Sequence, residues 1–233
     1  GLTIRSGHDS WVGDVSFNIV DDEEDWGLID MRVPGLFNVA NALAAAGAAD
    51  ILGIKHKHIL KALNKFRGTW RRFELVGEYN SALVVSDYAH HPDGIKATLE
   101  AARGWYPFKK IVLLYQPHQH NRTRKLFDDF VKSFAKCDEL ILAEIYDVAG
   151  RSADEDKAVS SKDLVTAIQK IPPPSQGEGR VRVGGQNLTA DHVFYAPDLA
   201  SAEDMVKQKV NKGDVLIIMG AGDVDSVARN LTK

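Results

Sequence analysis

From Leu75 onward, short apolar runs alternate along the chain with amphipathic segments of helical period. Apolar runs of this length are typical of buried strands, and amphipathic segments present one apolar face to a core. This alternation predicts strands over 83–85, 111–115, 139–143, 193–195 and 214–219, and helices over 92–103, 123–134, 161–171, 199–210 and 225–231. Strands that alternate with helices favour an α/β domain with a mostly parallel sheet covered on both faces.

The first part of the chain has a different pattern. Short alternating runs of apolar and polar residues predict strands over 15–20 and 26–33, and two further segments, 38–52 and 56–65, are predicted to be helices. A non-periodic stretch rich in arginine and aromatic residues follows at 66–74. We therefore predict two domains, 1–67 and 68–233.

One segment of the second domain departs from the alternation. Residues 171–190 contain three consecutive prolines and several glycines but few large apolar side chains. Such a segment buries too little apolar surface to offset the entropy lost on ordering. We predict a flexible surface insertion there.

Composition excludes several classes of protein. The net charge is -3 and the pI is about 6.3, so a nucleic-acid partner is not expected. No apolar run approaches the roughly 18 residues of a membrane span. The single Cys137 cannot form an internal disulfide, which fits a reducing compartment. Without a basic-then-apolar leader, we expect a cytoplasmic protein, and the opening residues suggest a fragment of a longer chain.

Three polar clusters directly follow predicted strands. The first is Asp87, Tyr88, His90 and His91; the second covers residues 116–124; the third is the Gly-Ala-Gly-Asp string at 220–223. Because parallel strands share one carboxyl edge, we expect the three clusters to lie together, where open α/β sheets bind ligands.

Several of these residues suit an anionic or nucleotide ligand. Asp87 is suited to accept from a ribose hydroxyl or to hold a cation. Arg122 is predicted at the start of a helix, where the dipole also favours an anion. The arginines of the domain boundary are placed to reach a ligand held between the domains. Interdomain salt bridges are the alternative for these boundary arginines.

A metal site is a second hypothesis. Four histidines, His90, His91, His118 and His120, are expected on one sheet edge, and two imidazole pairs can bind zinc. However, the chain has no His-Glu-x-x-His motif. It also has no Gly-x-x-x-x-Gly-Lys-Ser/Thr phosphate loop and no Gly-x-Gly-x-x-Gly after a strand.

Five motifs in order resemble the Mur ligases of peptidoglycan synthesis. They are the string from Val33 to Ala45, the Phe66–Glu74 stretch, Asp-Tyr-Ala-His-His-Pro at 87–92, Gln-Pro-His at 116–118 with Arg-Thr at 122–123, and Gly-Ala-Gly-Asp at 220–223. The resemblance covers nearly the whole chain from about residue 30. It implies that residues 68–233 form the Rossmann-like C-terminal domain, preceded by the tail of the central ATP-binding domain.

The resemblance also implies a reaction. In this family ATP and Mg²⁺ activate a carboxylate as an acyl phosphate, and an amine then forms the amide. Gln-Pro-His with Arg-Thr favours the member that adds L-alanine to UDP-N-acetylmuramate over the murein-peptide recycling ligase. That recycling ligase and a non-catalytic nucleotide- or amino-acid-binding module remain the alternatives.

Site residues follow from the same resemblance. Asn38 is expected at the adenine, Arg72 with Arg71 at the ATP phosphates, and Asp87 at the ribose. The residues expected around L-alanine are Tyr88, His90, His118 and Arg122, with the guanidinium on the carboxylate. No catalytic residue and no metal ligand is assigned.

The chain departs from the family pattern in three respects. Phe37 replaces a histidine before the asparagine, and Gln119 replaces an arginine, which weakens one expected carboxylate contact. The sugar-binding domain and the phosphate loop are also missing. We therefore expect no ATP turnover by this chain alone, and we expect the missing domains in cis or in trans.

Overall fold

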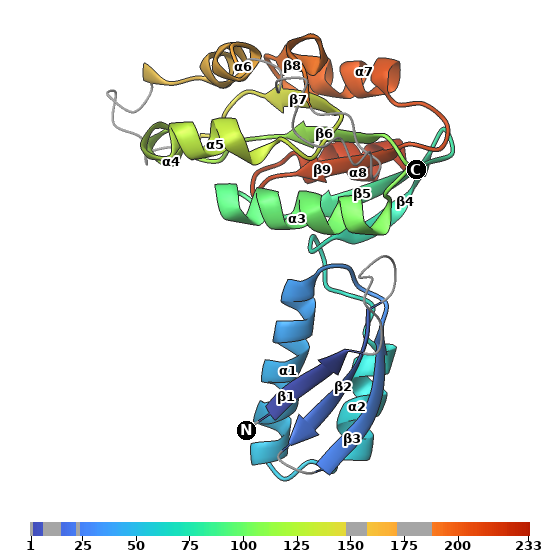
Figure 1. The fold of residues 1–233 in the computed structure, drawn as a ribbon. Helices are drawn as coiled ribbons and strands as arrows, with labels where there is room; N and C mark the ends of the chain where they lie inside the picture. Colours follow the sequence, from blue (N-terminus) through green and yellow to red (C-terminus); the bar gives the residue numbers. More distant parts are fainter. Residues whose placement is uncertain (1, 7–14, 22–23, 148–157, 172–187) are drawn as a thin grey trace, which may run out of the picture.

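The computed structural model describes residues 2–6, 15–21, 24–147, 158–171 and 188–233. The chain folds into a small N-terminal unit and a larger C-terminal unit, joined by the segment between α2 and β4 (Figure 1). Each unit has its own apolar core: among the described residues, the core cluster of the N-terminal unit shares no residue with the two clusters of the C-terminal unit.

The N-terminal unit is a three-stranded antiparallel sheet with two helices. Strands β1 (Leu2–Ser6), β2 (Val15–Asp21) and β3 (Glu24–Met31) pair in that order. Helices α1 (Leu36–Ile51) and α2 (His56–Lys65) pack on the sheet through Val39, Ala46 and Ile59. The alternation over 15–20 therefore buries every second residue of β2, including Phe17 and Ile19, as the pattern predicts.

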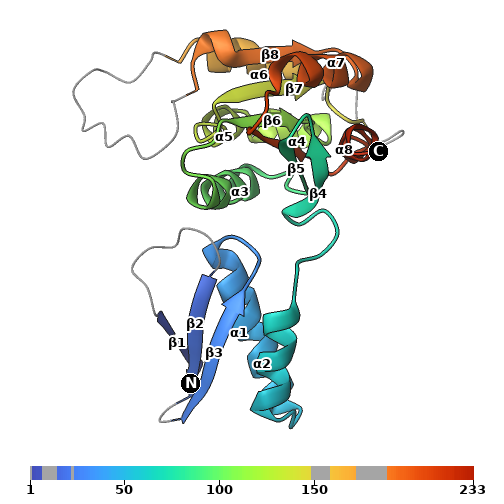
Figure 2. The same ribbon diagram turned by 90° about the vertical axis from the view of Figure 1, so that its right-hand side faces the viewer.

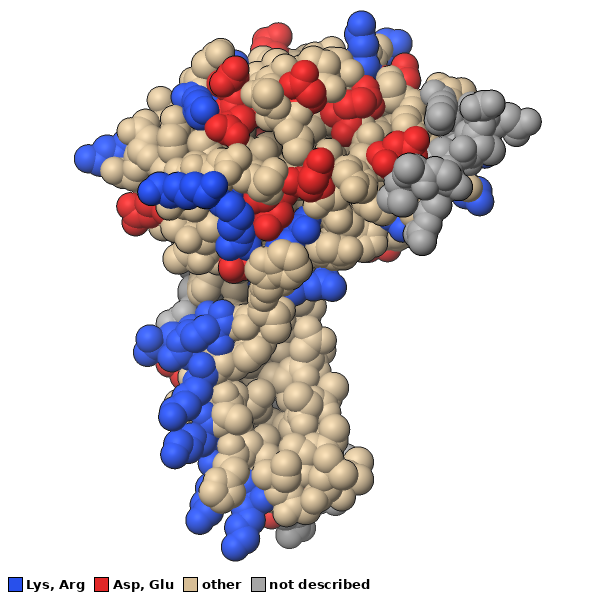
Figure 3. Space-filling view, turned by 180° about the vertical axis from the view of Figure 1, so that it is seen from behind, with Lys and Arg blue, Asp and Glu red and all other residues tan. Residues whose placement is uncertain are grey.

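One side of the N-terminal unit is strongly basic. Lys57, Lys61 and Lys65 are exposed at four-residue spacing on α2, opposite the buried Ile59. Figure 3 shows the basic side chains gathered along this side. The period of 3.6 residues explains the segregation, because residues four apart share one helix face.

The C-terminal unit contains a six-stranded sheet of order β4-β5-β9-β6-β7-β8. Its strands are β4 (Glu74–Tyr79), β5 (Ala82–Asp87), β6 (Ile111–Tyr115), β7 (Glu139–Ala143), β8 (Val193–Ala196) and β9 (Val215–Met219). All neighbours are parallel except β4 and β5, which form an antiparallel hairpin. The predicted mostly parallel α/β sheet is therefore confirmed.

Helices cover both faces of this sheet (Figure 2). Those on one face are α3 (Pro92–Trp105), α5 (Phe127–Ser133) and α6 (Ser161–Gln169), and those on the other are α7 (Leu199–Lys209) and α8 (Asp225–Leu231). Leu113 and Tyr115 of β6 face the first group, whereas Val112 and Leu114 face the second. The central strands are fully buried because both of their faces are covered.

One expectation about these elements was wrong, and one strand of the large sheet was missed. The single helix over 123–134 is instead α4 (His120–Lys125) followed by α5, with a bend at Leu126 (φ -113°, ψ 25°). Hydrogen bonds from Leu126 N to Arg122 O and from Phe130 N to Leu126 O continue across the bend. The edge strand β4 was not predicted, because it is only half buried and its Gly77 packs on Thr232, directly after α8, rather than filling a core position.

The remaining expectations concern boundaries and segments. Residues 66–73 connect the units, and we propose that the domain boundary predicted between Arg67 and Gly68 lies in this connection. Most of the insertion predicted over 171–190 lies outside the described residues. Within the part of the chain that the structure describes, no helix combines the length and apolar character that crossing a membrane requires.

Candidate ligand site between the two units

The three polar clusters meet at one edge of the large sheet. Strand β9 lies between β5 and β6, and Met219 at its end is level with both Asp87 and Tyr115. Backbone bonds join the strand ends, from Gly220 N to Asp87 O (3.1 Å) and from Gln116 N to Met219 O (3.0 Å). The expectation that these clusters share a carboxyl edge is confirmed.

This edge borders a cavity of about 750 Å³ between the two units. Its N-terminal wall is mainly apolar and includes Phe37, 40% exposed, and Leu63. The polar side chains that line it are Asn38, Asn41, Thr69, Arg72, Asp87, His90, His91 and Thr98. Apolar walls with a few converging polar groups are typical of small-molecule sites, whose volumes are roughly 300–1,000 Å³.

A strained turn aims Arg72 at this cavity. The residues on either side of it, Arg71 (φ 52°) and Phe73 (φ 48°), both have left-handed backbone conformations. Two carboxylates stabilise them: Glu74 Oε2 accepts from Arg71 N (2.9 Å), and Asp87 Oδ2 accepts from Phe73 N (2.8 Å). Among the described residues, the Arg72 guanidinium makes no hydrogen bond or ion pair, and it lies 5.5 Å from the centre of the Tyr88 ring. Left-handed non-glycine residues concentrate at functional sites.

Most of the hydrogen-bonding capacity of the Asp87 carboxylate is used within the protein. Besides Phe73 N, its carboxylate accepts from Ala89 N (2.8 Å) and from the Thr98 hydroxyl (3.3 Å). Only 6% of the residue is exposed, and this burial raises the pKa of the carboxyl despite those bonds. Asp87 therefore shapes the cavity wall in addition to any contact it makes with a ligand.

Asn38 lies at the start of α1 and lines the cavity. Its amide nitrogen donates to Pro34 O (2.7 Å), and its amide oxygen accepts from Asn41 Nδ2 (3.3 Å). These bonds hold the amide in place and leave its second N–H hydrogen and the second lone pair of its oxygen for a ligand.

The four residues expected around an amino acid form a continuous row. Tyr88 and His90 pack edge to face with ring centres 5.4 Å apart, and the His90 ring lies 6.4 Å from that of His118. Arg122 Nη1 donates to His118 O at 3.4 Å. Sequence positions 88 to 122 thus converge at one place.

The helix predicted from Thr123 begins three residues earlier, at His120, so Arg122 is the third residue of α4. Backbone hydrogen bonds continue from α4 into α5, and Arg122 therefore lies in the first turn of this helical stretch, near where the sequence predicts it. We assign the contact with an anion to its guanidinium, because a guanidinium forms charge-assisted hydrogen bonds with carboxylates and phosphates.

The boundary arginines have different surroundings. Arg72 lines the cavity, whereas Arg71 is only 6% exposed and is not among the lining residues. Its guanidinium donates to Gly220 O and to Gly222 O (3.0 Å). By the resemblance to the Mur ligases, Arg71 and Arg72 are expected at the ATP phosphates. The buried position of Arg71, away from the cavity, does not support such a contact for Arg71.

One residue of the site, Tyr146, was missed at the level of sequence, and the structure adds a contact made by Gln116 of the predicted second cluster. Tyr146 follows β7 and stacks on His118, with ring centres 5.4 Å apart and planes at 20°. Gln116 Oε1 accepts from Val224 N at 3.3 Å. A Cβ at Gly222 would lie 2.6 Å from Gln116 Oε1 and 2.7 Å from Tyr146 Cγ, so only glycine fits there. The rule that polar residues follow strands would have found Tyr146.

The histidines do not support the zinc hypothesis. Within the described ranges, no three His, Cys, Asp or Glu residues lie close enough to hold a metal ion. His120 Nδ1 bonds to Val159 O (2.8 Å), and His91 caps α3 by accepting from Asp93 N (3.4 Å). Both imidazoles therefore have local structural roles.

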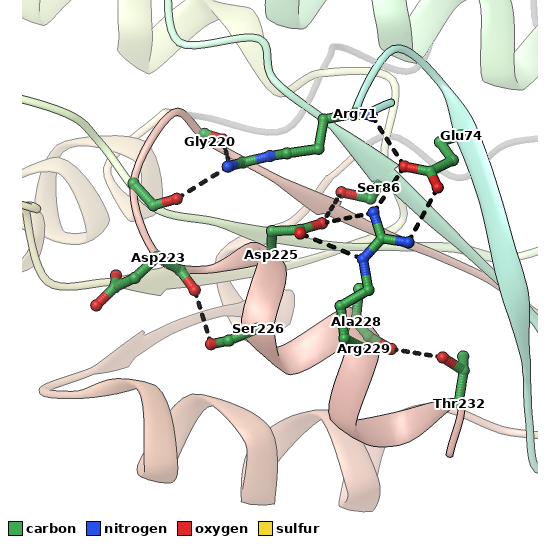
Figure 4. Close-up of polar contacts among 11 residues, drawn as sticks. Arg71, Glu74, Ser86, Gly220, Asp223, Asp225, Ser226, Ala228, Arg229 and Thr232 are labelled. Carbon is green, nitrogen blue, oxygen red and sulfur yellow. Dashed lines mark hydrogen bonds and ion pairs between the residues drawn. The ribbon is translucent and has the colours of Figure 1, made fainter. Parts of the chain in front are cut away.

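An ion-pair network holds Glu74, the carboxylate that accepts from Arg71 N in the strained turn (Figure 4). Arg229 of α8 binds Glu74 with both terminal nitrogens, at 2.9 and 2.6 Å, and also contacts Asp225. The hydrogen bond from Arg229 lowers the pKa of Glu74 below its usual value. This contribution to stability is fully present above the unfolded value near 4.5 and is lost as the pH falls through the lower folded value.

A pH-dependence follows from that shift. We expect Glu74→Gln to lose less stability than the wild type between pH 5 and about 3, because its side chain has no proton to take up. Urea unfolding across this range measures the difference. Glu78→Gln, an exposed position on the same strand, is the control and should follow the wild-type curve. Parallel curves for Glu74→Gln and wild type would contradict the assignment.

The architecture places this chain among the Rossmann-like α/β proteins, which bind ligands at the carboxyl edge of a parallel sheet. Residues 71–222, more than half of the chain, match the family model described as Mur ligase, glutamate ligase domain. The chain belongs to the Mur ligase family, as its motifs predict.

Two curated relatives of this chain carry the same name. The chain is 43% identical over 212 residues to UDP-N-acetylmuramate–L-alanine ligase of Clostridium acetobutylicum, with 90% of this chain and 41% of the relative covered. It is 38% identical over 211 residues to the same ligase of Desulforamulus reducens, with 91% and 41% covered. The chain thus spans about two fifths of the length of these relatives.

Solved structures agree on the fold. The UDP-N-acetylmuramate-alanine ligase of Thermotoga maritima superposes with a TM-score of 0.71 at 25% identity, covering 98% of this chain and 45% of that one. The folylpolyglutamate synthase of Mycobacterium tuberculosis, solved with ADP, has a TM-score of 0.65 at 16% identity, with 97% and 46% covered, and shows the fold alone. The fold of both units is therefore that of longer ligases.

Proposed function

We propose that this chain is the nucleotide- and amino-acid-binding part of an ATP-dependent ligase that joins L-alanine to UDP-N-acetylmuramate in peptidoglycan synthesis. The observation that carries the proposal is the juxtaposition of two features. The cavity lined by Arg72 lies beside the row formed by Tyr88, His90, His118 and Arg122. The names of the relatives supply the substrates.

The cavity fits a nucleotide by size and chemistry. Its apolar wall, with the half-exposed Phe37 ring, suits a base, and Asn38 offers an amide for the base edge. Arg72 suits phosphate oxygens, because the guanidinium fork pairs with them at two points. ATP, bound with Mg²⁺, would supply the phosphoryl group that activates a carboxylate.

The row of polar residues fits a small amino acid. The Arg122 guanidinium would bind the α-carboxylate, and Tyr88, His90 and His118 would enclose the rest of the molecule. The centres of neighbouring rings in this row lie 5.4 and 6.4 Å apart, and this close grouping suits a small side chain such as a methyl group. The murein-peptide recycling ligase, the second candidate, would have to accept a whole peptide at the same place.

The matched region covers 41% of these relatives, and we propose that the remaining ligand sites of the ligase lie in the part of the relatives outside this region. No phosphate-loop motif occurs among the 233 residues. The cradle for the triphosphate and Mg²⁺ and the site for the UDP-sugar would belong to that additional sequence. This chain by itself is expected to bind ligands without turnover.

Calorimetric titration of the chain with L-alanine, in the presence of a non-hydrolysable ATP analogue, tests the proposal. We expect Arg122→Ala to weaken L-alanine binding by about tenfold, the loss of one charge-assisted contact, and to leave nucleotide affinity unchanged. Lys125→Ala, on the same short helix but exposed, is the control.

Three outcomes separate the candidates. Unchanged L-alanine affinity in Arg122→Ala would remove Arg122 from the site. Binding of a murein tripeptide in place of L-alanine would favour the recycling ligase. Binding of both ligands without amide formation, after the missing domains are supplied, would favour a non-catalytic module.

A further inference from the structure

We propose that Arg71 is a positioning residue that fastens the Gly220–Gly222 turn to Tyr88 and so shapes the amino-acid end of the site. The proposal rests on the proposed function only for the identity of the ligand. The clamp, as we call it, consists of Arg71, Glu74, Arg229 and the carbonyls of Gly220 and Gly222.

The side chain of Arg71 joins segments far apart in sequence. Its Nη2 donates to the carbonyls of Gly220 and Gly222, about 150 positions away, and the whole residue is 6% exposed (Figure 4). Its Nε, also buried, has no hydrogen-bond partner among the described residues. Burying a guanidinium costs several kcal/mol of hydration, so its carbonyl contacts must hold it in place.

The backbone of Arg71 holds Tyr88. Arg71 O accepts from Tyr88 N at 2.8 Å, and the guanidinium carbon lies 4.9 Å from the centre of the Tyr88 ring. Tyr88 in turn packs against His90. One residue therefore contacts both the turn after β9 and the first member of the row proposed to enclose L-alanine.

The third part of the clamp fixes the conformation of Arg71 itself. The left-handed backbone at Arg71 is stabilised where Glu74 accepts from its N–H. Arg229 binds Glu74 at two points, and Asp225, which also contacts Arg229, accepts from the Ser86 hydroxyl. Helix α8, the linking turn and β5 are thus joined around a single conformation of residue 71.

The turn at 220–222 has little freedom of its own to replace these contacts. A Cβ at Gly220 would lie 2.7 Å from Gln116 O, and Gly222 packs on Tyr146. A shift of this turn would therefore move Gln116 and Tyr146, and through Tyr146 the stacked His118. This is the physical route from Arg71 to both ends of the row.

Hydrogen exchange of the unliganded chain tests the clamp directly. Arg71→Lys keeps the positive charge, but the lysine side chain is one atom shorter than the arginine and lacks the planar guanidinium whose Nη2 reaches both carbonyls. We expect the amides of Tyr88, Gly220 and Val224, all hydrogen-bonded in the structure, to exchange about tenfold faster, while the core amides of β7 keep their protection. Arg67→Lys is the matched control, because Arg67 is exposed and its guanidinium, among the described residues, donates only to the nearby carbonyls of Asn64 and Phe66.

Ligand binding provides the second readout. We expect Arg71→Lys to weaken L-alanine binding by about tenfold and nucleotide binding by less than threefold, a split that general destabilisation would not produce. Arg229→Lys, which disturbs the clamp from its outer end, should show the same pattern more weakly. If exchange becomes faster throughout β7 in Arg71→Lys, that variant is generally destabilised. The same measurements on Arg229→Lys then test the clamp, and an unchanged exchange rate at Tyr88 and Gly220 would contradict it.

The outcomes are distinct. Unchanged exchange at Tyr88, Gly220 and Val224 in a folded Arg71→Lys protein would overturn the proposal, as would equal losses for both ligands. If the wild-type chain binds no L-alanine but the exchange result holds, the clamp stands and the proposed function fails.

Discussion

Arg72→Ala is expected to weaken nucleotide binding by about 100-fold or more, the range found when one partner of a close charge pair is removed. Arg72 is the arginine of the connection that lines the cavity, and its guanidinium is not engaged by hydrogen bonds among the described residues. Its two neighbours, Arg71 and Phe73, adopt left-handed backbone conformations that cost conformational energy. This cost is consistent with a functional need for the Arg72 side chain to point into the cavity.

Calorimetry or competition with a fluorescent nucleotide would measure this loss. Arg67→Ala removes a guanidinium five positions earlier that does not line the cavity, and it should bind nucleotide as the wild type does. Equal affinities for Arg72→Ala and Arg67→Ala would show that the nucleotide lies elsewhere. The test also separates Arg72 from Arg71, for which we expect a small nucleotide effect.

Asp87→Ala is expected to lower the free energy of unfolding by about 3 kcal/mol, the cost of leaving two buried N–H groups without an acceptor. The carboxylate now accepts from Phe73 N, Ala89 N and the Thr98 hydroxyl. Because Phe73 N lies in the turn that presents Arg72, we also expect nucleotide binding to fall. The two losses together identify Asp87 as a structural support of the site.

Urea unfolding and titration on the same preparations measure the two losses. Asp93→Ala is the control, since the side chain of Asp93 is 81% exposed near the start of α3, and its loss should cost less than 1 kcal/mol. A loss below 1 kcal/mol for Asp87→Ala would mean that water replaces the missing acceptor. A full loss of nucleotide affinity without destabilisation would instead indicate a direct ligand contact alone.

Local patterns predicted most elements of the fold. Helices 56–65 and 225–231 and strands 111–115 and 139–143 occur with the predicted bounds, because each has a strong period or a continuous apolar run. Strand β4 was not predicted, because this half-buried edge strand with Gly77 has neither a strong period nor a continuous apolar run. The bend at Leu126 was not predicted, because the apolar residues keep their helical spacing across it.

The candidate site was predicted in part. The rule that polar residues following parallel strands share an edge placed Asp87, His90 and His118 together, and the structure confirms it. The same rule could not distinguish Arg71 from Arg72. These are adjacent arginines in a non-periodic stretch, and no pattern indicates which of them is buried.

By itself, the amino-acid sequence determined most of the strands and helices, the family and the edge of the sheet where the polar clusters meet. These properties depend on short-range periodicity and on residue types that directly follow strands. Only the tertiary structure decided that Arg72 faces the cavity while Arg71 is buried against Gly220 and Gly222. That difference arises from two left-handed backbone conformations, held by Glu74 and Asp87, and contacts across about 150 positions leave no trace in a local pattern.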